Sequence, residues 1–179
     1  MDIFYATHFG HTEQIAGSLA HAIRASGVPA ALHDIRQHYP SHAQICSSDP
    51  CVLISPVRYG IHLPSARKLL KQIAPLTPRK PLFLLSVNLT ARKEGRSRSL
   101  ENPYLRKWIS RSGAQPRLAE AIAGKLEYPQ YNIVDRSMMR LMMMIAGGPA
   151  DGQSVVDYTP WPHVSTLASR IVDLVNSDR

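Results

Sequence analysis

The segment Thr7-His8-Phe9-Gly10-His11-Thr12 joins an apolar strand pattern to an amphipathic helix pattern near the N-terminus. Residues 1–7 are mostly apolar, whereas residues 11–25 repeat apolar positions at helical spacing. Thr7 and Thr12 supply hydroxyls, and Gly10 allows a tight turn. A turn that enters a helix N-terminus directs backbone N–H groups and a favourable dipole toward an anion. The segment therefore predicts a phosphate site, although a plain strand-to-helix turn with a threonine cap fits the same residues.

The spacing of this loop, Thr-x-x-Gly-x-Thr, narrows the kind of phosphate that it suits. The loop lacks the lysine of a Walker A loop and the glycine triplet of a dinucleotide fingerprint. It resembles the loop that holds the phosphate of FMN in flavodoxins. Compared with flavodoxins generally, Phe9 stands where a hydroxyl is usual and His11 replaces an amide. We therefore expect the loop to rely on backbone N–H groups and to hold FMN weakly.

The rest of the chain alternates between strand and helix patterns. Strands are predicted at 28–32, 51–55, 81–87 and 119–126, and helices at 64–73 and 162–175. Continuous apolar strands separated by helices indicate a parallel sheet that is covered on both faces. We therefore predict a single flavodoxin-like α/β domain over 1–179: a doubly wound, five-stranded parallel sheet of order 2-1-3-4-5. In such sheets ligands bind beyond the carboxyl ends of the strands, which selects the loops at 7–12, 56–61 and 88 onward.

The composition limits the range of functions. The chain carries a net charge of +8, which favours an anionic partner such as a carboxylate ligand or an acidic lipid surface. The basic residues are not interleaved with aromatic ones, so no nucleic-acid partner is predicted. Two cysteines, no secretory signal and no bilayer-spanning run predict a cytoplasmic protein with reduced thiols. The histidines are too scattered to predict a metal site.

Two segments depart from a minimal domain. Residues 88–102 are polar and basic, and we predict a long basic insertion there because the segment exceeds an ordinary strand-to-helix loop. The second segment, 138–145, is rich in methionine. Helical spacing would turn Met138, Leu141, Met142 and Ile145 toward a core and leave Met139 and Met143 partly exposed, the more economical interpretation. The alternative is a helix that lines an apolar ligand site or rests on a membrane.

Three further motifs carry a more specific resemblance. The chain reads Ser-Pro-Val-Arg-Tyr-Gly-Ile-His at 55–62 and Ser-Val-Asn-Leu-Thr-Ala-Arg-Lys at 86–93. Ala-Gly-Lys-Leu-Glu-Tyr-Pro follows at 123–129. In this order they resemble the flavodoxin-like protoporphyrinogen IX dehydrogenases of bacterial haem biosynthesis, over essentially the whole chain. The resemblance implies an FMN-dependent oxidoreductase.

That family oxidises protoporphyrinogen IX to protoporphyrin IX and passes the electrons to ubiquinone or menaquinone. The resemblance implies a cytoplasmic enzyme that is peripherally associated with the inner membrane. It also implies three groups of FMN-binding residues, while the hydride acceptor is the flavin itself. These are Thr7, His8, Phe9, Gly10, His11 and Thr12 around the phosphate; Pro56, Val57, Arg58, Tyr59 and Gly60 along one side of the ring; and Ser86, Val87, Asn88 and Leu89 along the other side.

The basic segment has three interpretations under this resemblance. Arg92, Lys93, Arg96 and Arg98 could pair with the substrate's propionates, because bidentate arginine contacts suit carboxylates. The same residues could hold the protein on anionic lipid near the quinone pool. The third interpretation, a solvated run of charges, has about the same weight as the other two together.

Three other functions compete with this one. A flavodoxin-type electron carrier would share the fold, but such carriers use an acidic face, and the charge of +8 argues against one. An NAD(P)H:quinone reductase on the same fold would consume NAD(P)H. A flavin-free interaction module would use only the basic surface.

Overall fold

The computed structural model describes residues 1–93, 95–97 and 101–177. Its centre is a parallel sheet in the order β2-β1-β3-β5-β6, which confirms the predicted order 2-1-3-4-5 when these strands are counted along the chain. The strands are β1 (Asp2–Tyr5), β2 (Ala31–Asp34), β3 (Cys51–Arg58), β5 (Leu82–Val87) and β6 (Leu118–Ile122). A short strand, β4 (Ile61–His62), folds back on the end of β3.

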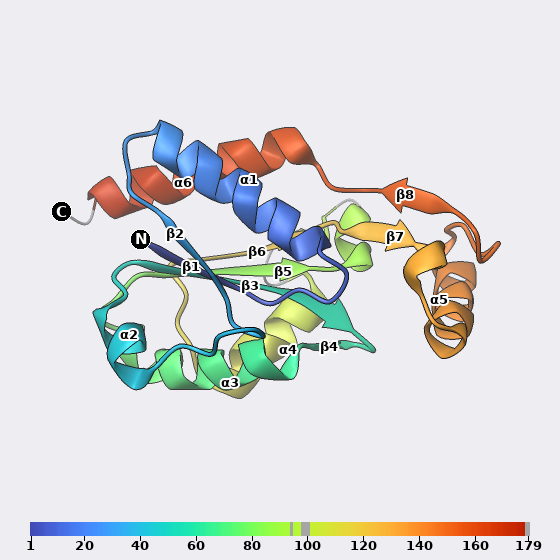
Figure 1. Cartoon of the computed structure of the whole chain (residues 1–179), viewed down its shortest axis with the longest axis horizontal. Helices are drawn as coiled ribbons and strands as arrows, with labels where there is room; N and C mark the ends of the chain where they lie inside the picture. The colour runs from blue at the N-terminus through green and yellow to red at the C-terminus, as the bar shows by residue number, and fades with distance from the viewer. Residues whose placement is uncertain (94, 98–100, 178–179) are drawn as a thin grey trace.

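Helices cover both faces of the sheet, as Figure 1 shows. On one face α1 (His11–Ala25) and α6 (Trp161–Ser177) bury the apolar side chains that the helical spacing predicts. On the other face lie α2 (His42–Ser47), α3 (Pro64–Ile73) and α4 (Pro103–Ser112), with a 3-10 turn, η1 (Ala74–Leu76), after α3. The three loops selected from the sequence therefore meet at one end of the sheet.

β3 runs three residues beyond its predicted end at Ser55, and two other predicted strands differ more from the structure. The second strand was predicted at 28–32 and occupies 31–34, because Gly27 ends α1 and residues 28–30 only connect the two elements. The last strand, predicted at 119–126, divides after Ile122. At Gly124 an added Cβ would lie 3.0 Å from Cγ1 of Val87, so the chain passes very close to β5 as it leaves the sheet. The remainder forms β7 (Lys125–Glu127), which pairs antiparallel with β8 (Val155–Asp157).

A small subdomain follows this break. It contains η3 (Tyr128–Gln130) and α5 (Ile133–Ala146), which projects beyond the end of the sheet in Figure 1. The predicted orientation of α5 is wrong. Met143 is 2% exposed and Met139 packs on the small core of Leu126 and Tyr128, whereas Ile145 is 80% exposed. The prediction failed because α5 contacts this small cluster rather than the sheet. The side that faces the cluster includes buried Asp135, which the apolar pattern could not anticipate.

The segment 88–102 contains η2 (Leu89–Arg92) before α4 begins at Pro103. Its two ends are joined, because the Asn102 side-chain amide donates to Oδ1 of Asn88 over 3.1 Å. Asn102 also caps α4 by accepting from the Leu105 N–H. The structure does not confirm that this segment is an insertion.

Candidate functional site

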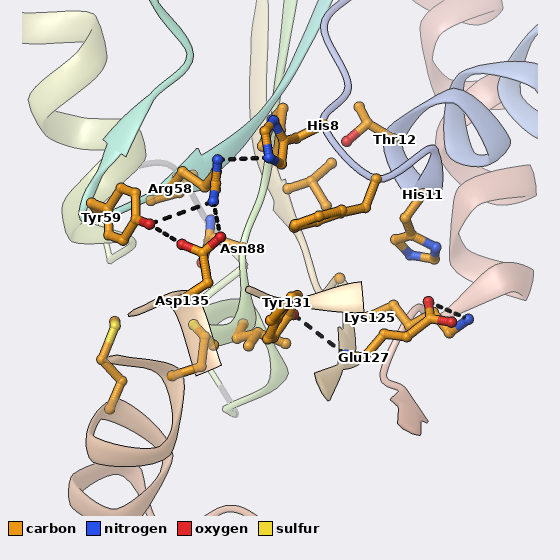
Figure 2. A pocket seen from close by; sticks show the side chains of 18 of the residues that line it. His8, His11, Thr12, Arg58, Tyr59, Asn88, Lys125, Glu127, Tyr131 and Asp135 are labelled. Carbon is orange, nitrogen blue, oxygen red and sulfur yellow. Dashed lines mark hydrogen bonds and ion pairs between the residues drawn. The ribbon is translucent and has the colours of Figure 1, made fainter. Parts of the chain in front are cut away.

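A pocket opens beyond the carboxyl ends of β1, β3 and β5, where the three predicted loops meet. Figure 2 shows its side chains converging from the sheet loops and from α5. The predicted residues that line it are Thr7, His8, Phe9, His11, Thr12, Pro56, Val57, Arg58, Tyr59, Gly60, Val87, Asn88 and Leu89. The remaining lining residues are Thr90, Tyr104, Gly124, Lys125, Glu127, Tyr131, Asp135, Met138, Met139 and Met142.

The first loop has the geometry of an anion site. Gly10 takes the left-handed conformation, with a φ of 81°, and stands at the N-cap of α1. The free N–H groups of that helix start therefore face the loop. The hydroxyl of Thr7 is buried and has no hydrogen-bond partner among the described residues. A buried hydroxyl without a partner costs about 1–3 kcal/mol, which a bound phosphate oxygen would offset. These features fit the phosphate of a flavin nucleotide.

Basic side chains surround His8 at the edge of this loop. Arg58 donates a hydrogen bond of 2.7 Å to Nε2 of His8, and Arg36 donates to the carbonyl of Thr7. Burial lowers the pKa of His8, and the nearby Arg58 and Arg36 lower it further. The imidazole is therefore neutral at pH 7 and acts as an acceptor for Arg58, which leaves the arginines as the positive charges of this corner.

His11 is turned away from the loop centre. Its Nε2 lies 2.7 Å from the hydroxyl of Thr159, just beyond β8, and 3.8 Å from a carboxylate oxygen of Asp157. Burial lowers the pKa of His11 despite the opposing effect of Asp157. Its Nδ1 is buried and has no partner among the described residues. The side chain thus links α1 to the segment that follows β8.

An aromatic pair forms the wall opposite β3. The rings of Phe9 and Tyr131 have centroids 5.3 Å apart, and the Arg58 guanidinium lies 5.4 Å from the Phe9 centroid. Phe9 lacks the hydroxyl expected of a phosphate loop but adds an apolar ring to the site. Flat aromatic surfaces suit a planar heterocycle.

An ion pair crosses the mouth of the pocket. The carboxylate of Asp135 accepts hydrogen bonds from Arg58 and from the Tyr59 hydroxyl, as Figure 2 shows. Tyr59 is a non-glycine residue in the left-handed region, with a φ of 50°, and Gly60 follows at 77°. This unusual turn directs both side chains from the end of β3 toward α5. The pair therefore joins the predicted loop to α5, which the sequence offered as a ligand-lining helix only in the alternative interpretation.

The loop after β5 contributes differently from the prediction. The Asn88 side chain points inward: its amide donates to Oγ of Ser86 over 2.9 Å, and its carbonyl accepts from the Ala91 N–H. Ser86 is fully buried and does not line the pocket. Gly10 is likewise absent from the lining, although it shapes the first loop. Asn88 therefore fixes the backbone conformation of this wall, because its side chain caps η2.

Arg92, Lys93 and Arg96 of the basic segment lie outside the pocket lining, whereas Asn88, Leu89 and Thr90 of the same segment belong to it. Arg92 donates to the carbonyls of Leu89 and Ala146 over 3.1 and 3.0 Å, so its guanidinium ties η2 to the end of α5. Arg96 donates to the Glu101 carbonyl, and Lys93 is exposed. Arg98 lies outside the described residues.

The subdomain forms part of the site. Met138, Met139 and Met142 line the pocket, which agrees with the alternative interpretation of the methionine-rich helix; Tyr131 and Asp135 line it too, and the sequence did not indicate them. The available signal was the methionine-rich pattern together with the resemblance around 123–129.

Among the described residues, no three metal-ligating side chains cluster together. No helix in the described ranges is long and apolar enough to cross a bilayer.

The fold and the pocket define a flavodoxin-like protein. Residues 2–153 match the model of a flavodoxin domain family. The fold is similar to that of an archaeal flavodoxin, at a TM-score of 0.55 and 11% identity over 98% of this chain and 99% of that one. It is also similar to rubredoxin oxygen:oxidoreductase from Desulfovibrio gigas, at a TM-score of 0.59 and 19% identity. There the match covers 98% of this chain and 36% of the other, so these structures show the fold alone.

Similarity in sequence is more specific. The chain is 32% identical to protoporphyrinogen IX dehydrogenase (quinone) of Escherichia coli K12, over 97% of this chain and 95% of the relative. It is 30% identical to the protein of that name in Leishmania major, over 93% of this chain and 72% of the relative. The chain therefore belongs to the protoporphyrinogen IX dehydrogenase (quinone) family of flavodoxin-domain proteins.

Proposed function

We propose that this protein is an FMN-dependent protoporphyrinogen IX dehydrogenase that delivers electrons to ubiquinone or menaquinone in haem biosynthesis. The observation that carries the proposal is the family relationship over nearly the whole chain, which includes the subdomain as well as the flavodoxin core. The pocket supports it, because an anion site and an aromatic wall adjoin one another beyond the sheet. A docking protein for single electrons would not need the apolar extension of the pocket along α5.

The cofactor in this proposal is FMN. The hydroxyls of Thr7 and Thr12 and the backbone of residues 8–11 would hold its phosphate at the start of α1. Residues 56–60 would lie along one side of the ring and residues 86–89 along the other, with Ser86 supporting that wall from below. When bound, FMN supplies the hydride acceptor and relays the electrons. The protein orients the cofactor and encloses it in a largely apolar pocket that excludes water.

The residues around the ring position have separate tasks. Phe9, Met138 and Met142 present apolar surface to the substrate and exclude water. Arg58 is held by Asp135 and His8, so its positive charge stays at the pocket mouth at neutral pH. A fixed cation there stabilises negative charge that develops on a bound ring system.

The location in this proposal is the cytoplasmic face of the inner membrane, by peripheral contact. The outer side of α5 is apolar, with Ile133 at 83%, Leu141 at 55% and Ile145 at 80% exposed. Exposed apolar surface of this extent marks an interaction surface. Its position beside the pocket suits a quinone that stays in the lipid. Exposed Lys93 and Arg96 add positive charge for anionic headgroups.

The proposal is tested with purified protein under anaerobic conditions. The visible spectrum, with and without added FMN, reports cofactor binding. Protoporphyrinogen IX and a short-chain ubiquinone or menaquinone are then added, and porphyrin fluorescence is followed. We expect fluorescence to rise only when protein, FMN and quinone are all present. A flavin-containing protein without turnover would favour the electron carrier. Consumption of NAD(P)H with quinone would favour the reductase, and failure to bind FMN would favour the interaction module.

A further inference from the structure

A second cavity adjoins the flavin pocket on the α3–α4 side of the sheet. It offers a volume of about 540 Å³, within the usual range for small-molecule sites. Gly60 and Tyr104 line both cavities, and a Cβ on Gly60 would lie 3.8 Å from the Tyr104 ring. Figure 1 shows α3 and α4 side by side, with β4 next to α4. We call this cavity the basic groove; its lining residues are Gly60, Ile61, His62, Pro64, Arg67, Lys68, Lys71, Tyr104, Lys107, Trp108, Arg111 and Ser112.

The charge of the basic groove is one-sided. Its lining contains Arg67, Lys68 and Lys71 from α3 and Lys107 and Arg111 from α4, and no aspartate or glutamate of the described part of the chain. Lys68 lies over the Tyr39 ring at 4.6 Å. The other four have no ion pair or side-chain hydrogen bond to any described residue. Like charges spaced four apart on one helix, such as Lys107 and Arg111, destabilise it. Repulsion that the fold leaves uncompensated is relieved by a bound anion.

The floor of the basic groove is aromatic. Trp108 is 5% exposed, and its ring stacks on His62 with centroids 3.8 Å apart. Burial lowers the pKa of His62 to about 3, so the imidazole adds no charge of its own. The indole N–H of Trp108 is buried without a partner among the described residues. A flat, apolar floor below a ring of cations suits an anion that belongs to a larger hydrophobic molecule.

We propose that the basic groove is a carboxylate subsite, which binds the propionate groups of the tetrapyrrole while the rest of the ring system reaches the flavin pocket past Gly60 and Tyr104. This rests on the function proposed above. Protoporphyrinogen IX carries both propionates on one edge and apolar substituents on the other. The groove matches the charged edge, and the methionines of α5 in the adjoining pocket match the apolar edge. Arg67 and Arg111 provide the planar donors that grip carboxylates.

This assignment differs from the sequence-based interpretation of the basic segment. The Arg92 guanidinium is already bonded to two backbone carbonyls, so it is poorly placed to serve a substrate. In contrast, Arg67, Lys71, Lys107 and Arg111 of the basic groove have no ion pair or side-chain hydrogen bond to any described residue.

The test compares a diacid with its diester. Protoporphyrin IX and protoporphyrin IX dimethyl ester are titrated in the same detergent against FMN-loaded protein, and flavin and tryptophan fluorescence report binding. The variant is Lys71→Gln/Lys107→Gln, which removes one charge from each helix. The control is Arg79→Gln/Arg106→Gln, which removes the same charge at exposed residues outside both linings.

We expect the wild-type protein to bind the diacid at least tenfold more tightly than the diester. Each removed groove charge should weaken diacid binding about fivefold, the upper range for an exposed pair, without affecting the diester. The control should keep the wild-type preference. In turnover, the groove variant should raise KM for protoporphyrinogen with little change in kcat or FMN content. Equal binding of diacid and diester by the wild-type protein would overturn the subsite, as would an equal loss in variant and control.

The two proposals fail in different ways. If the wild-type protein oxidises protoporphyrinogen and the groove substitutions leave diacid binding unchanged, the subsite is wrong and the function stands. If there is no turnover but the diacid preference disappears only in the groove variant, the groove binds carboxylates and the proposed reaction is wrong. A thermal melt of the apoprotein gives an independent check of folding. Relief of repulsion should leave the Tm of the groove variant equal to or above that of the wild-type protein.

Discussion

Asp135 on α5 and Arg58 at the end of β3 form an ion pair across the mouth of the flavin pocket, although they lie 77 residues apart in the chain. The Asp135 side chain is 6% exposed and that of Arg58 is 26% exposed. The pair is a principal polar link between the sheet and the subdomain. Since both residues line the pocket, the stability of α5 and the shape of the site depend on the same contact.

Asp135→Asn should therefore loosen the subdomain. The substitution keeps the shape of the side chain but removes the charge that holds Arg58. We expect the free energy of unfolding to fall by about 2 kcal/mol, less than for a fully buried pair because Arg58 reaches solvent. Urea denaturation measures the change. Lys125→Gln is the control, because it breaks the more exposed pair with Glu127 and should cost less than about 1 kcal/mol. Equal losses in both variants would contradict the assigned role of Asp135.

Thr7→Val should have opposite effects on the protein with and without FMN. The Thr7 hydroxyl is buried without a partner among the described residues, so its removal should stabilise the apoprotein by up to about 1 kcal/mol. The same change should weaken FMN binding about tenfold, the equivalent of one lost hydrogen bond to a charged group. Thermal melts and FMN titration provide the two measurements.

Thr77→Val is the matched control for this experiment. The Thr77 hydroxyl donates to the Ala74 carbonyl and accepts from the Gln115 N–H, remote from the pocket lining. Its loss should destabilise the protein by about 1–2 kcal/mol and leave FMN affinity unchanged. If Thr7→Val instead destabilised the apoprotein as Thr77→Val does, the hydroxyl would already have a partner before FMN binds.

Gly10→Ala should separate backbone strain from cofactor binding. Gly10 and Gly27 both have a φ of 81°, and a Cβ at either position meets no atom within 4 Å. Alanine should therefore cost each site about 1 kcal/mol of stability through strain alone. Gly10→Ala should also weaken FMN binding, whereas Gly27→Ala, at the far end of α1, should not. FMN titration of the two variants measures this difference. A similar loss of FMN affinity in both would show that the loop around Gly10 does not bind the phosphate.

The sequence predicted the sheet and the three loops that meet at its carboxyl edge, but it indicated α5 as part of a ligand site only in the alternative interpretation. Buried strands and helices such as β3 and α6 carry strong periodicity, because each packs against a large, continuous core. Residues on α5 face a small cluster and solvent instead, so the same apolar pattern predicted the wrong buried side of this helix. The pairing of Arg58 with Asp135 depends on where the chain turns after Gly124. A close approach between segments distant in the chain leaves no local signature. Likewise, no pattern within α3 or α4 alone shows that their cations share one groove.

His62→Gln should flatten the dependence of stability on pH. Burial lowers the pKa of His62 to about 3 in the folded protein, whereas the unfolded chain titrates near 6.5. The unfolded state therefore binds the proton first as the pH falls. Stability from this group is fully present above pH 6.5 and is lost between pH 6.5 and 3. From pH 7.5 to 5.5 the wild-type protein should lose about 1.4 kcal/mol more than the variant.

Urea denaturation at these two pH values measures that difference. Other histidines, such as His33 beside Asp2 and His163 beside Glu120, are present in both proteins and cancel in the comparison. The variant also loses the contact with Ser86, which changes stability at both pH values alike. Parallel pH profiles would show that His62 titrates normally.

The outer face of α5 gives the last prediction, which concerns the membrane. Leu141 and Ile145 are 55% and 80% exposed, and insertion of each side chain into a lipid interface should contribute about 1 kcal/mol, less than full burial. Leu141→Gln/Ile145→Gln should therefore weaken binding to vesicles that contain phosphatidylglycerol at least tenfold in a sedimentation assay. Leu32→Gln, at an exposed residue of β2, an edge strand of the central sheet, should not weaken it. Turnover with a water-soluble quinone should be unchanged, whereas turnover with a long-chain quinone in vesicles should fall with binding. Vesicle binding that survives the double substitution would place the membrane contact elsewhere on the molecule.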